Sequence, residues 1–121
     1  MILDDSILAW LKDSNAPQPG RAVLAAATKE SARILASIAP GKAVEVRVPP
    51  FVAVQCVDGL SHRRGTPPNI VEMPVRQWLQ LATGLCTLED LENTPKVTIS
   101  GTRAHEISRW MPIIYVRGNQ T

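Results

Sequence analysis

The chain has 121 residues with a formal net charge of +2, and only 4% of its residues are aromatic. This length predicts one domain, whose core must consist mainly of Val, Leu, Ile and Ala. The dispersed, nearly balanced charge argues against a nucleic-acid partner, and acidic residues at the start with no run of ~20 apolar residues predict a soluble, cytoplasmic protein.

A short helix is predicted near the N-terminus, because Asp4 and Asp5 can cap a helix whose apolar residues begin at Ile7. The next segment, residues 14–20, contains two prolines and a glycine, which are typical of an extended linker. The pattern leaves open whether the first helix docks on the domain or moves freely. The expected units are a helix and proline-rich linker over residues 1–20, a main domain over 21–115 and a polar tail over 116–121.

A long amphipathic helix is predicted over residues 21–39, where apolar residues recur at helical spacing. Charged residues occupy the opposite side, and Pro40 with Gly41 ends the helix because proline breaks the hydrogen-bond ladder. The residues expected on the apolar side are Val23, Ala27, Ile34, Leu35 and Ile38.

Extended segments follow this helix. Residues 44–48 alternate strictly between valine and charged residues, which is typical of a strand with one exposed face. Residues 51–57 are apolar on both faces, so we expect a strand that is covered on both sides. Further strands are predicted over residues 69–73 and 97–100, and a basic Gly/Pro loop precedes the first of them.

Three more helices complete the predicted elements. Pro74 suits the start of a helix that Gly84 closes, and Thr87 with Asp90 can form the capping box of a short helix. The final helix is interrupted by Pro112, and its apolar side consists of Ala104, Ile107, Trp110 and Met111. A sheet with helices on one face is the simplest architecture that buries all of these apolar positions, which places the chain in the α/β (α+β) class.

Several short motifs, each present once, follow one another along the chain. The longest are residues 46–56, VRVPPFVAVQC, and residues 78–84, WLQLATG. Residues 64–69, RGTPPN, lie between them, and Ser100-Gly101 with Arg103-Ala104 follow. Together these motifs resemble the small bacterial sterol carrier protein (SCP) family, especially its actinobacterial members, over roughly residues 21–112.

The resemblance implies an SCP-like fold, in which helices cover a five-stranded, mostly antiparallel sheet and an apolar tunnel lies between the two. Eukaryotic members bind sterols, fatty acids and acyl-CoA and move them between membranes. The implied function is therefore non-enzymatic binding of such an apolar ligand, with transient membrane contact. The alternative is a protein-interaction or auxiliary module with a filled core, because a related module accompanies mycothiol-dependent isomerase-like proteins.

The candidate ligand-binding residues are apolar side chains on the strand of residues 51–57 and on two of the predicted helices. An apolar ligand needs only a dry concave surface with a few polar groups. The same side chains could equally fill a solid core, because protein interiors pack to crystal-like density. The candidates are Val54, Cys56, Trp78, Leu81, Trp110 and Met111, with Arg64 expected near the mouth.

The basic loop that begins at His62 and ends at Pro68 offers a second kind of contact. Arg63 and Arg64 could present a cationic rim to a carboxylate, a phosphate or a protein partner. Arg64 could instead pair with a glutamate and hold the loop in shape. The sequence alone does not separate these two roles.

Catalytic and metal chemistry find little support in the sequence. The two histidines and two cysteines are scattered without zinc-ligand spacing. Cys56 lies in an apolar strand, where the pKa of a thiol rises and its nucleophilicity is lost. We therefore expect a protein that is not an enzyme and that holds no metal or cofactor.

Overall fold

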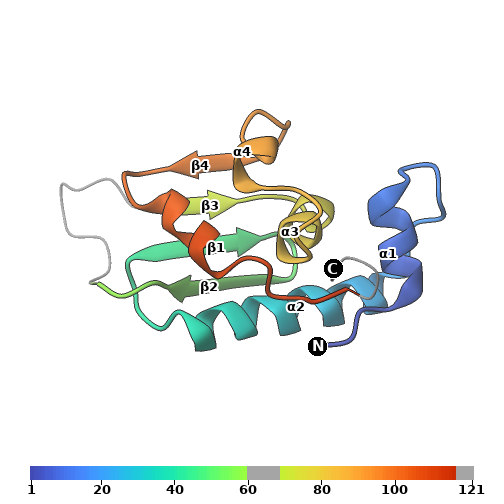
Figure 1. Cartoon of the computed structure of the whole chain (residues 1–121), viewed down its shortest axis with the longest axis horizontal. Helices are drawn as coiled ribbons and strands as arrows, with labels where there is room; N and C mark the ends of the chain where they lie inside the picture. Colours follow the sequence, from blue (N-terminus) through green and yellow to red (C-terminus); the bar gives the residue numbers. More distant parts are fainter. Residues whose placement is uncertain (60–68, 117–121) are drawn as a thin grey trace.

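The structure is a computed structural model that describes residues 1–59 and 69–116. Its mixed α/β class agrees with the prediction (Figure 1). The predicted final helix is present as a 3-10 helix. In chain order the elements are α1 (Asp5–Lys12), α2 (Arg21–Ile38), β1 (Val44–Val48), β2 (Val52–Cys56), β3 (Ile70–Glu72), α3 (Val75–Ala82), α4 (Leu88–Leu91), β4 (Thr98–Ser100) and the 3-10 helix η1 (Ala104–Trp110).

The sheet formed by the described residues has four strands in the order β2-β1-β3-β4, so the expected five strands are wrong. The central pair, β1 with β3, is parallel, whereas the two outer pairs are antiparallel. The register explains this arrangement. β2 ends with Cys56 opposite Val44, and β3 starts with Ile70 opposite Glu45, so both lie at the same end of the sheet. A strand that enters the sheet where β1 begins must run parallel to β1.

One face of the sheet is buried and the other is open to solvent. The three valines of β1 have no exposed surface, whereas Glu45 is half-buried and Arg47 is exposed. The prediction that β2 is covered on both faces is wrong, because Ala53 and Gln55 are exposed. β2 is an edge strand, and α2 packs against it on one side only, as Figure 1 shows.

The buried side of α2 differs from the predicted one. Val23 and Ile38 are 37% and 47% exposed, and the helix instead buries a stripe that includes Thr28 and Ser31. The indole nitrogen of Trp78 donates to the Ser31 hydroxyl over 2.8 Å. The small side chains of this stripe let α3 approach α2 closely, which an apolar periodicity alone does not reveal. The full stripe is Leu24, Ala27, Thr28, Ser31, Ala32 and Leu35.

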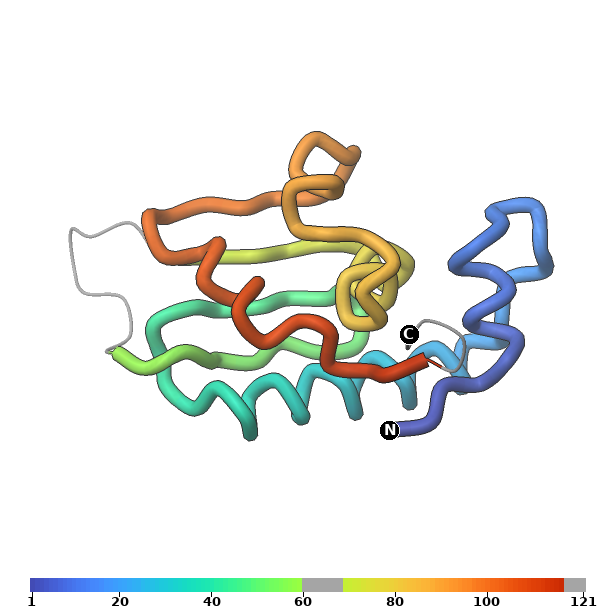
Figure 2. The backbone as a smooth tube through the Cα atoms, in the orientation of Figure 1, coloured from blue at the N-terminus to red at the C-terminus, as the bar shows by residue number. Residues whose placement is uncertain are grey.

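The first helix docks on α3, which answers the question that the sequence leaves open. The guanidinium group of Arg76 donates to the Trp10 carbonyl over 2.6 Å and lies 4.9 Å from the centre of the Trp10 ring. Ile7 and Leu11 are buried in the same apolar core as the sheet residues. Figure 2 shows α1 at one end of the sheet, beside the first turns of α2.

Among the helices described, none has both the length and the apolar character that crossing a membrane requires.

Candidate functional site

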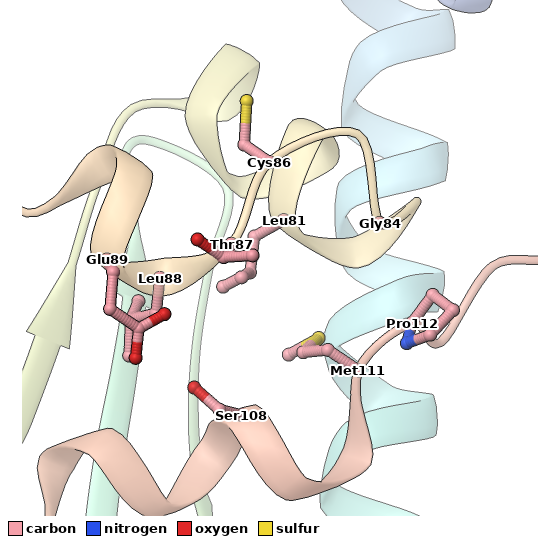
Figure 3. Close-up of a pocket in the computed structure, with 9 residues that line it drawn as sticks. All are labelled: Leu81, Gly84, Cys86, Thr87, Leu88, Glu89, Ser108, Met111 and Pro112. Atoms are coloured by element: carbon pink, nitrogen blue, oxygen red, sulfur yellow. The ribbon is translucent and has the colours of Figure 1, made fainter.

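A pocket of about 270 Å³ lies between the end of α3, α4 and η1 (Figure 3). Apolar atoms make up most of its lining, and few polar groups reach it. The lining residues are Leu81, Gly84, Cys86, Thr87, Leu88, Glu89, Ser108, Met111 and Pro112.

One wall of the pocket is fixed by the end of α3 and the start of α4. Gly84 ends α3 with φ of +80°, a left-handed conformation that favours glycine. The chain then turns into α4, whose capping box is the predicted one. The Asp90 amide donates to the Thr87 hydroxyl over 3.1 Å, and the Thr87 amide donates to the Asp90 carboxylate over 2.8 Å. This cap directs Leu88 into the protein, where it is buried.

The opposite wall is formed by η1 and the segment that follows it. The amides of Ile113 and Ile114 both donate to the carbonyl of Ala82, over 2.8 and 2.9 Å. These bonds hold the chain after η1 against the end of α3. Met111 and Pro112, which come just before them, are thereby placed across the pocket from α4, as Figure 3 shows.

Burial decreases from the floor of the pocket to its rim. Leu81 and Leu88 are buried and form the floor. Cys86, Ser108 and Met111 are half-buried and form the walls, whereas the remaining lining residues are exposed. An apolar molecule in the pocket would therefore lose most of its water contacts near the two leucines.

Ser108 lines the pocket, but its hydroxyl oxygen is buried. Its hydroxyl oxygen is shielded from solvent and has no hydrogen-bond partner among the described residues. Buried polar groups are hydrogen-bonded in the great majority of cases, so this hydroxyl is an exception, and it has no surface that a molecule in the pocket could touch.

Both thiols are poor nucleophiles at neutral pH. Burial raises the pKa of Cys56 to about 11. Burial also raises the pKa of Cys86, and the nearby carboxylate of Asp90 raises it further against the opposing effect of Arg76. Cys86 differs in being half-buried, so a small reagent can reach it, and its sulfur points away from Met111 and Ser108 (Figure 3).

Arg103, one of the motif residues, makes hydrogen bonds within the protein. Its side chain donates to the Glu106 carboxylate over 2.6 Å and to the Asp58 carbonyl over 2.8 Å. Its backbone amide donates to the side chain of Asn69 over 3.0 Å. The hydrogen bond from Arg103 lowers the pKa of Glu106. These contacts connect the end of β2 with the starts of β3 and η1.

Two of the seven predicted ligand-binding residues, Leu81 and Met111, line the pocket. Trp78 and Cys56 are fully buried in the core, and Val54 and Trp110 are half-buried outside the lining. Arg64 and the whole loop of residues 62–68 lie outside the described residues. Ligand binding by any of the seven stays a prediction.

Sequence reasoning missed the other lining residues, above all Ser108. One signal was available, because Ser108 lies four residues after Ala104 and three before Met111, at helical spacing on the side predicted to be apolar.

A comparison of the sequence with known protein families gives one match, and a comparison with curated proteins gives none. Residues 20–113, most of the chain, match the family described as bacterial SCP ortholog. This match confirms the resemblance seen in the sequence motifs, and the family is consistent with a lipid-binding or carrier role. The chain therefore belongs to the bacterial SCP ortholog family.

Proposed function

We propose that the protein binds an apolar small molecule or a lipid segment, without catalysis, in the pocket between α3, α4 and η1. The observation that carries this proposal is the apolar lining over the buried floor of Leu81 and Leu88. Ligand sites are typically concave and apolar, with a few placed polar groups. The family, whose members include carriers of apolar molecules, supports the same role.

The proposed position of the ligand is not the one that the family resemblance implies, which is a tunnel between the sheet and the helices. The valines of β1 and the Trp78 indole are fully buried against neighbouring side chains. Leu81 and Met111 are instead among the residues that line the pocket. We therefore place the ligand beside these two residues, at the end of α3 that is held to the segment after η1.

The volume of about 270 Å³ suits a small or partly inserted ligand. Sites for drug-sized molecules measure roughly 300–1,000 Å³. Met111 is unbranched and flexible, so a rotation of its side chain would lengthen the pocket along η1. A medium-length alkyl chain is therefore a suitable probe of the site.

Alkylation of Cys86 tests this proposal, with Cys56 as the internal control. The protein is treated with iodoacetamide at several pH values, alone or with 1-decanol or decanoic acid, and each thiol is followed by mass spectrometry. Cys86 should react more slowly than free cysteine, because its raised pKa leaves less thiolate, and its rate should increase as the pH rises. Cys56 should stay unmodified.

Occupation of the pocket should partly slow Cys86 alkylation, because Cys86 belongs to the lining segment that a ligand restrains, although its sulfur points away from Met111 and Ser108 (Figure 3). The proposal requires that at least one of the two probes gives saturable protection. If neither probe changes the Cys86 rate at saturating concentration, the pocket does not take up an alkyl chain and the proposal is wrong.

A further inference from the structure

We infer that a second site, in a cavity of about 400 Å³ at the end of the sheet where α2 and α3 begin, binds a phosphate monoester group. Arg21 and Arg76 line this cavity together with the rings of Trp10 and Phe51. Figure 1 shows α1, the start of α2 and the turn between β1 and β2 at the same end of the sheet. The cavity shares no lining residue with the pocket between α3, α4 and η1, so ligands can occupy the two sites independently.

The charge of the cavity lining is positive. Arg21 and Arg76 are its charged residues, and no Asp or Glu is among the described residues that line it. None of the ion pairs between described residues includes either arginine. Two cations that face one cavity repel each other, whereas an anion in the cavity is attracted by both.

Each guanidinium group lies over an aromatic ring and keeps N–H donors that a ligand can use. The Arg21 group lies 5.0 Å from the centre of the Phe51 ring, and the Arg76 group lies 4.9 Å from the centre of the Trp10 ring. Arg76 donates to the carbonyls of Trp10 and Leu11 over 2.6 and 3.3 Å, which occupies two of its five N–H donors. A guanidinium fork can bind two phosphate oxygens at once.

A phosphate monoester fits these surroundings better than a singly charged anion does. It carries roughly −1.5 to −2 charges at neutral pH and has three acceptor oxygens, which suits two guanidinium groups. Neither α2 nor α3 has an acidic residue in its first turn or a capping side chain, so the positive ends of both helices add to the attraction. Leu24 and Val75 in the lining can contact an organic group attached to the phosphate.

A neighbouring cavity of about 490 Å³ extends the basic surface along α2. It shares Arg21, Pro50 and Phe51 with the first cavity, so the Arg21 side chain borders both. Lys29 is its other charged lining residue, and no carboxylate is among the described residues that line it. The positive charge therefore continues beyond the site of the phosphate group, where a larger ligand could extend.

Phenyl phosphate and phenyl sulfate test the charge requirement with the same organic group. Binding of each to the full chain is measured by isothermal titration calorimetry at neutral pH and physiological ionic strength. Phenyl phosphate should bind several-fold more tightly, because phenyl sulfate carries a single negative charge. Binding of phenyl sulfate that equals or exceeds that of phenyl phosphate would overturn the inference.

Arg21→Gln assigns the binding to this cavity, with Arg33→Gln as the matched control. Both are exposed arginines of α2, but Arg33 lines neither cavity. Arg21→Gln should weaken phenyl phosphate binding about tenfold, because charge-assisted hydrogen bonds are lost, whereas Arg33→Gln should weaken it less than about twofold. Arg21→Lys keeps the charge without the fork and should give an intermediate loss. Equal losses for Arg21→Gln and Arg33→Gln would mean that net charge alone attracts the anion, and the inference would be wrong.

Vesicles distinguish the two sources of a phosphate monoester, a soluble molecule and a lipid headgroup. Phosphatidic acid in phosphatidylcholine vesicles presents such a group at a membrane surface, and co-sedimentation measures binding. Co-sedimentation that Arg21→Gln abolishes supports a lipid headgroup, whereas phenyl phosphate binding without co-sedimentation supports a soluble molecule. If the protein binds neither phenyl phosphate nor these vesicles, or if Arg21→Gln leaves all binding unchanged, the cavity does not hold a phosphate group. Decanol uptake by the other pocket is unaffected by either result.

Discussion

Replacing Trp78 by alanine should lower the free energy of unfolding by about 3–5 kcal/mol, the usual cost of deleting a buried tryptophan side chain. Trp78 is fully buried on α3, and it is among the largest side chains of the core. Small domains unfold with roughly 5–15 kcal/mol, so this single change removes a large share of the stability. Urea denaturation followed by far-ultraviolet circular dichroism measures the difference.

The contribution of the indole hydrogen bond to stability can be measured separately from the contribution of the buried indole volume. Trp78→Phe keeps an aromatic ring but removes the donor to Ser31, whose hydroxyl still donates to the Ala27 carbonyl over 2.7 Å. Ser31→Ala removes the acceptor from the same pair. A double-mutant cycle of these two changes should give a coupling energy of about 1 kcal/mol. A Trp78→Ala variant as stable as the parent would mean that α3 does not pack on α2 as described.

Gly41→Ala should lower the free energy of unfolding by roughly 3–5 kcal/mol, because strain and overlap act together. Gly41 has φ of +144°, which side-chain-bearing residues rarely adopt. A Cβ atom there would lie 2.0 Å from the Val57 carbonyl oxygen and 2.3 Å from its carbon. Both contacts are with backbone, so the connection from α2 to β1 or the end of β2 would have to move.

Gly20→Ala is the matched control for this change. Gly20 has φ of −62°, and no atom lies within 4 Å of an added Cβ. Alanine there should change the free energy of unfolding by less than about 1 kcal/mol, since the lower entropy of the unfolded chain offsets a slightly poorer helix cap. Equal stability of the two variants by urea denaturation would contradict the placement of Gly41 against Val57.

Local signals predicted most of the elements. The capping box at Thr87 and Asp90 fixed the start of α4, and the valine alternation of residues 44–48 fixed the buried face of β1. Both depend on neighbours within a few residues, which a sequence displays directly. The same holds for α1, where Asp4 accepts a hydrogen bond from the Ser6 amide over 2.8 Å.

The sequence did not predict features that depend on contacts between residues far apart in the chain. Which side of α2 is buried depends on Trp78, which lies 47 residues after its hydrogen-bond partner Ser31. Small polar side chains on a helix do not reveal such a partner in the sequence. The covered face of β2 depends on its position at the sheet edge. The number of strands came from family resemblance, whereas the residue pattern itself indicated only the segments that the described sheet contains.

The pocket was only partly predictable for a related reason. Apolar character pointed to Leu81 and Met111, which line it, but equally to Trp78 and Cys56, which fill the core. The sequence does not distinguish an apolar side chain that lines a pocket from one that packs against other side chains in the core. The difference arises from where the segment after η1 is attached, and the bonds from Ile113 and Ile114 attach it to Ala82 at the end of α3.

Mapping of 1-decanol binding by backbone amide chemical shifts tests the central claim most directly. The claim is that an apolar ligand occupies the space between α3, α4 and η1. Saturable shift changes centred on Leu81, Leu88, Ser108 and Met111 are the result that the account predicts. Changes centred on the sheet at Val54 and Cys56, or no saturable change at all, would contradict it.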